Sequence, residues 1–215
     1  MVYSPHKLIN FNRLCGFGFK ETSLLSRPTT NATNTVSGNP MKTTSNEIFK
    51  QLLTEYNLPE DLSFSVDLPT EVQNILDDQI LLTDLGVTLK SFDRLYKARE
   101  DWENQSIIED SENHFHVDWY IEPANSKKAF ILGVKTLTLL ADKFRKEKIS
   151  GVRFWYSFQT PELGLLWAKQ NNLEEEDDEH FISDRLSFYK FRDGENIIST
   201  NENENQFCAI LTIDI

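Results

Sequence analysis

The segment between residues 126 and 148 constrains the fold of this chain more than any other. Its apolar side chains recur at intervals of four, three, four and three residues. They are Phe130, Val134, Leu137, Ala141 and Phe144. This spacing aligns them on one face of an α-helix, and a basic last turn suits the negative end of the helix dipole. A helix with one long apolar face needs another layer of secondary structure to pack against.

Strands that would form this layer are predicted on both sides of the helix. Residues 114–122 alternate between polar and apolar side chains, and residues 152–158, 181–191 and 207–213 are rich in apolar and aromatic side chains. A Thr160-Pro161 pair begins a second helix that runs to about residue 170. The order of elements predicts an α/β domain in which a mixed sheet carries helices on its faces.

The part of the chain before residue 114 is predicted to be mainly helical. Thr44 and Glu47 have capping-box spacing, which predicts a helix over about 45–56. Further helices are expected over 70–82 and 88–103, and a short strand over 62–68. Together with the second half, these elements predict a single α/β domain over 45–215.

The first 44 residues are predicted to be a disordered, basic leader. Arg27 to Thr44 is rich in Thr, Asn, Ser, Pro and Gly. Two interpretations stay open: the leader is an extension ahead of a true start at Met41, or residues 1–40 are an organellar transit peptide. We expect a cytoplasmic protein in the first case and a protein of an organelle matrix in the second.

Charge argues against nucleic acid as a partner. Four cations and one acid give residues 1–40 a charge of +3, which leaves −15 for the rest of a chain whose net charge is −12. Such a body repels phosphate backbones. No stretch has the roughly 18 apolar residues of a membrane helix, so no membrane partner is expected. Two cysteines are too few for a disulfide framework, which favours a reducing compartment.

Residues 117–191 resemble the C-terminal half of the GNAT-type N-acetyltransferases. The resemblance lies in the order of elements: a strand that ends at Pro123, the long helix, the strand from Val152, and a helix that contains Leu166 and Trp167. It implies a GNAT-like second half and an acyl-CoA-dependent enzyme that acetylates a small-molecule or protein amine.

The same resemblance implies the site residues. Acetyl-CoA would lie over the turn that opens the long helix, and either Tyr156 or the carboxylate of Glu122 would carry the proton. The residues implied in cofactor binding are Ile121, Ser126, Lys127, Lys128, Ala129 and Phe130. The turn lacks the glycines of the family's phosphate loop, and Trp167 stands where the family often has a tyrosine. These departures favour the alternative, a non-catalytic protein-interaction module on a GNAT-like fold.

His114, His116 and Asp118 are spaced two residues apart, so on a strand they would share one face. Two imidazoles and a carboxylate are metal-ligand types. The simpler interpretation is that they form the wetter face of a strand whose other face is apolar. We therefore expect no metal site here.

Overall fold

The computed structural model describes residues 41–83, 86–92, 105–121, 125–171, 183–195, 197–201 and 205–215. The chain has the predicted α/β class. Its elements are β1 (Lys42–Ser45), α2 (Glu47–Glu55), α3 (Thr70–Asp77), β2 (Ile80–Thr83), β3 (Gly86–Leu89), α5 (Gln105–Glu112), the 3-10 turn η2 (Asp118–Tyr120), α6 (Ser126–Lys146), β4 (Val152–Gln159), α7 (Pro161–Gln170), β5 (Ser183–Lys190) and β6 (Ala209–Asp214).

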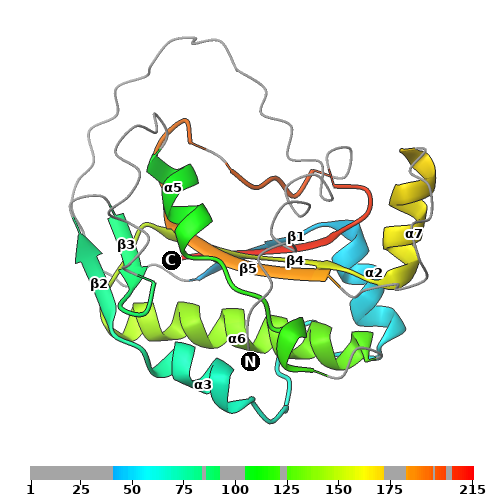
Figure 1. The fold of residues 1–215 in the computed structure, drawn as a ribbon, viewed down its shortest axis with the longest axis horizontal. Helices are drawn as coiled ribbons and strands as arrows, with labels where there is room; N and C mark the ends of the chain where they lie inside the picture. The colour runs from blue at the N-terminus through cyan, green and yellow to red at the C-terminus, as the bar shows by residue number, and fades with distance from the viewer. Residues whose placement is uncertain are drawn as a thin grey trace, which may run out of the picture.

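A four-stranded sheet forms the centre of the domain, with the strand order β1-β6-β4-β5 (Figure 1). All pairings between the described strands are antiparallel, including that of β4 with β5 on either side of α7. A parallel pair would need a helix packed back across the sheet. Helix α7 buries no side chain and lies beyond one end of the sheet (Figure 1).

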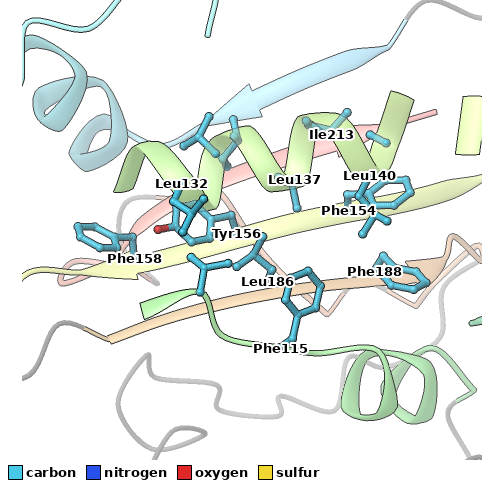
Figure 2. Close-up of a cluster of buried hydrophobic side chains, with 14 of the residues drawn as sticks. Phe115, Leu132, Leu137, Leu140, Phe154, Tyr156, Phe158, Leu186, Phe188 and Ile213 are labelled. Atoms are coloured by element: carbon cyan, nitrogen blue, oxygen red, sulfur yellow. The ribbon is translucent and has the colours of Figure 1, made fainter. Parts of the chain in front are cut away.

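Helix α6 covers one face of this sheet; it starts at the predicted residue and ends at Lys146, two residues before the predicted end. Its side chains Leu132, Leu137 and Leu140 meet Phe154 and Phe158 of β4 in the main core (Figure 2). These side chains are at least 99% buried. Removal of this apolar surface from water, at roughly 25 cal/mol per Å2, is the main stabilising term of the fold.

The opposite face of the sheet is covered by α5 (Figure 1). Acidic side chains of α5 are hydrogen-bonded and paired with cations at this interface. Asp110 of α5 accepts a hydrogen bond from the Trp155 indole at 2.6 Å and pairs with Arg185 at 2.7 Å. Glu109 accepts from the amide of Val87 at 2.6 Å and pairs with Arg192. Burial raises the pKa of Glu109, and the contact with Arg192 opposes that rise. Charges buried at this interface are thus paired, as their desolvation requires.

The folded domain begins earlier than the sequence predicts. Lys42–Ser45 form β1 and pair with β6, so these residues are not part of a disordered leader. Helix α2 is capped by Asn46 instead of Thr44: the Asn46 side chain accepts from the amide of Phe49 at 3.1 Å. It also accepts from the amide of Ile210 at 2.9 Å, which ties the helix start to β6. Residues 1–40 lie outside the described part of the chain.

Three further predictions before residue 114 are wrong in part. Residues 62–68 form no strand, because the positive φ of Leu62 and the bond from the Phe64 amide to the Leu62 carbonyl turn the chain. The helix that starts at Thr70 ends at Asp77, and β2 follows it. Of the helix expected over 88–103, residues 88 and 89 belong to β3 and residues 90–92 form a turn. Residues 93–103 lie outside the described part of the chain.

The strand expected over 114–122 does not form in its described part, residues 114–121. Among these residues only Phe115 pairs with the sheet, through an isolated bridge to Leu186 of β5, and η2 follows three residues later. The amide of Val117 donates to the side chain of Asp184 at 3.1 Å instead of to a strand carbonyl. A side chain has therefore taken the hydrogen bond that would continue the ladder. Within the described residues, no helix is long and apolar enough to cross a membrane.

Candidate functional site

The turn at the start of α6 holds most of the residues implied in cofactor binding. Lys127 and Lys128 are exposed in the first turn, at the positive end of the helix dipole. The Asn125 side chain accepts from the amide of Lys128 at 2.9 Å, so the helix caps itself there. The two lysine side chains are thus accessible to an anion. The backbone amide of Lys128, which could otherwise bind a phosphate oxygen, already donates to Asn125.

The other implied cofactor residues differ in exposure. Ala129 and Phe130 are fully buried and belong to the core, so they offer backbone but no side-chain surface to a ligand. Ser126 and Ile121 are half-buried. Glu122, one of the two implied proton carriers, lies outside the described residues.

Tyr156, the other implied proton carrier, is a core residue. Its side chain is 0% exposed and donates to the carbonyl of Ala129 at 3.4 Å. Burial raises the pKa of its hydroxyl well above the ordinary value. The ring also lies against Gly133 of α6, where there is no room for a Cβ. A proton carrier must reach a substrate, and this packing gives Tyr156 no such access.

His114, His116 and Asp118 do not share the one face that the sequence predicts for a strand. His114 points back to α5, where its Nδ1 lies 2.6 Å from the carbonyl of Ser111. Burial lowers the pKa of His114 to about 4. His116 and Asp118 instead meet Asp184 of β5, and one ligand atom from each of the three lies within 4.8 Å of the others. We call His116, Asp118 and Asp184 the carboxylate–histidine cluster.

The cluster is assembled from two elements that are distant in sequence. Asp184 is 0% exposed, at the start of β5, and its carboxylate accepts from the amide of Val117 at 3.1 and 3.3 Å. Its backbone carbonyl contacts Nδ1 of His116, whose Nδ1 also lies 3.7 Å from Oδ1 of the same aspartate. Asp118 stands at the first position of η2, and its Oδ1 is buried with no hydrogen-bond partner among the described residues.

The electrostatics of the cluster follow from two adjacent carboxyls, of which Asp184 is fully buried and Asp118 is partly buried. Burial first, and then the charge of Asp184, raise the pKa of Asp118 to about 8. Burial raises the pKa of Asp184 to about 7. Burial also lowers the pKa of His116, which the nearby Asp118 opposes. Burial and mutual repulsion therefore disfavour the ionisation of both carboxyls at once, and a nearby cation would offset that repulsion.

An exposed indole lies beside the cluster. The ring of Trp119 stacks on that of His116, with centroids 4.6 Å apart and planes at 20°. Trp119 is 60% exposed, and the His116 side chain is 12% exposed. The cluster therefore lies at the margin of the core, within reach of solvent.

Sequence reasoning found two members of the cluster and missed Asp184. A signal for it exists: alternation along β5 places Asp184 on the same face as the buried Leu186 and Phe188. An acid in the core-facing register of a strand must be paired, protonated or bound to a cation. This rule marks Asp184 as unusual without naming its partners.

The described residues thus present two candidate sites for a small ligand or an ion, the α6 turn and the carboxylate–histidine cluster. The family described as Uncharacterized protein PM0498 family matches residues 44–215, and the chain belongs to this family. No curated protein and no solved structure gives a significant match to the chain.

Proposed function

We propose that this protein is a non-catalytic interaction module that binds a basic partner protein through α7. The observation that carries the proposal is the surface of this helix. None of its ten residues is buried, although it contains Leu165 and Leu166, which are 37% and 54% exposed. A surface helix ordinarily buries its apolar residues against the core. Adjacent apolar residues left on the outside are typical of a surface that binds a partner.

Charge indicates the chemistry of the partner. The chain carries −15 beyond its first forty residues, so a basic surface is attracted to it and an acidic one is repelled. An apolar contact on α7 would supply affinity, and the surrounding charge would supply the association rate and the discrimination between partners.

The test compares two exposed leucines. Leu166→Asp removes apolar surface from α7, and Leu82→Asp makes the same change in β2, where Leu82 is 71% exposed. We expect wild type and Leu82→Asp to capture the same basic protein after cross-linking in cells, identified by mass spectrometry, and Leu166→Asp to lose it. Equal capture by all three proteins, at matched melting temperatures, would refute a docking surface on α7.

The second candidate function is acetyl-CoA-dependent N-acetylation of an amine, which Lys127 and Lys128 favour. Both are exposed at the N-terminus of a 21-residue helix, where a pyrophosphate would gain from their charge and from the helix dipole. CoA would then raise the melting temperature by mass action. The double change Lys127→Glu and Lys128→Glu would abolish that rise. Absence of any shift at millimolar CoA removes this candidate and leaves the interaction module.

A further inference from the structure

We propose that His116, Asp118 and Asp184 form a binding site for one divalent transition-metal ion, such as Zn2+ or Mn2+. One imidazole nitrogen and two carboxylates are a donor set that suits these ions. The site is independent of α7 and of the α6 turn. The sequence led us to expect no metal because the histidine row was to be the wet face of a strand. The structure forms no such strand and adds a third donor from β5.

The spacing of the donors fits a single ion. One candidate donor atom from each of the three residues lies within 4.8 Å of the other two. Donors that share an ion at about 2.0–2.2 Å lie roughly 3–4 Å apart. Binding therefore requires a contraction of less than about 2 Å, which rotation of the half-exposed Asp118 side chain on η2 can supply.

An ion also provides a partner for a carboxylate oxygen that has none within the described residues. Asp184 has the amide of Val117 as a donor, whereas Oδ1 of Asp118 is buried with no hydrogen-bond partner in the described chain. Buried polar atoms in folded proteins are nearly always paired. Two carboxylates that face each other repel, and a bound cation converts that repulsion into ligation. The competing state is a proton shared between the two carboxyls.

The residues around the cluster hold the His116 ring in a fixed orientation. The His116 ring is oriented by the carbonyl of Asp184 and by stacking on Trp119, so it is held before an ion arrives. Its 12% exposure provides a route for entry. Three protein ligands leave at least one coordination position for water or for an anionic ligand.

The experiment uses the full chain after treatment with chelator, titrated with Zn2+ and separately with Mn2+ by calorimetry. We expect one ion per chain. Asp118→Asn and His116→Gln each remove a donor and are expected to weaken binding at least tenfold. His114→Gln is the matched control, because His114 contacts the Ser111 carbonyl through Nδ1 and supplies no ligand atom to the cluster, although its ring lies edge-on to that of His116 with centroids 5.7 Å apart. The affinity of this variant is expected to stay within about twofold of wild type.

Two results would overturn the proposal. The first is the absence of saturable binding of either ion at millimolar concentration, which would leave the shared proton as the state of the cluster. The second is binding that survives both Asp118→Asn and His116→Gln, which would place the ion elsewhere on the chain. A variant that fails to fold is identified by circular dichroism. Asp184 is left intact because its carboxylate also holds the amide of Val117.

Discussion

Replacement of Gly133 by alanine tests the packing of α6 on the sheet. An alanine Cβ at this position would lie less than 3.0 Å from three atoms of the Tyr156 side chain: the ring carbons Cζ and Cε2 and the hydroxyl oxygen. Favourable carbon–carbon contacts begin at about 3.5 Å. The ring has little freedom to move, because it is 0% exposed and lies beside Phe130 and Phe158, with centroids at 6.4 and 6.1 Å.

Two opposing effects set the magnitude. Alanine in a helix interior is favoured over glycine by roughly 0.5–1 kcal/mol. Overpacking of a core costs typically about 1–3 kcal/mol, and a clash with a rigid aromatic ring falls at the upper end of this range. We expect a net loss of about 2 kcal/mol in the free energy of unfolding from the Gly133→Ala change. For a domain of this size that is a fall of about 4–8 °C in melting temperature.

Gly164→Ala in α7 is the matched control for this prediction. There the nearest atom to an added Cβ is Oε1 of Gln159 at 3.6 Å, an ordinary contact. The control is therefore expected to gain roughly 0.5–1 kcal/mol from helix propensity alone. Urea unfolding of both variants gives the two signs directly. A Gly133→Ala variant as stable as wild type would show that α6 does not approach Tyr156 this closely.

Three further predictions concern hydrogen bonds and charge. Arg185→Met leaves Asp110 buried without its cation and should cost about 3–5 kcal/mol in urea unfolding; a loss below about 1 kcal/mol would mean that the pair is solvated. Asn46→Ala removes the acceptor for two amides, one of them on Ile210, and should cost about 2 kcal/mol, more than the roughly 1 kcal/mol of an ordinary cap. Burial lowers the pKa of His114 to about 4. Between pH 6.5 and pH 4 the unfolded chain therefore binds a proton at His114 that the native chain does not bind, so the free energy of unfolding falls as the pH falls through this range. His114→Gln should flatten that loss between pH 7 and pH 5, and an unchanged slope would refute the burial of this ring.

The second half of the fold was predictable because its signals are local. The apolar spacing of α6 belongs to one helix and does not depend on its partners. Residues 152–158 and 181–191 are rich in apolar and aromatic side chains and bounded by turn signals, and β4 and β5 form within one or two residues of these limits. Their antiparallel pairing was not predictable, because α7 is helical by its own sequence whether or not it packs across the sheet.

The errors occur where the outcome depends on distant residues. Residues 114–122 alternate as a strand does, but only Phe115 finds a strand partner. The amide of Val117 is held by Asp184, which lies beyond α6, β4 and α7 in the sequence. Alternation indicates that a segment is extended and has two unlike faces. It does not show what will accept its backbone hydrogen bonds.

The candidate sites lie near one end of the central sheet. Asp184 pairs across the sheet with Phe158, and α7 begins just after β4 ends at Gln159. Phe130 in the first turns of α6 contacts the same Phe158, with ring centroids 5.4 Å apart.

The proposals at this end of the sheet can still be separated by experiment. Leu166 is not a member of the carboxylate–histidine cluster. Leu166→Asp should therefore leave the metal affinity within about twofold of wild type, while it abolishes capture of the partner. His116→Gln should do the reverse. Loss of both properties in either variant would mean that the partner and the ion share one surface, because two independent sites respond to such changes additively.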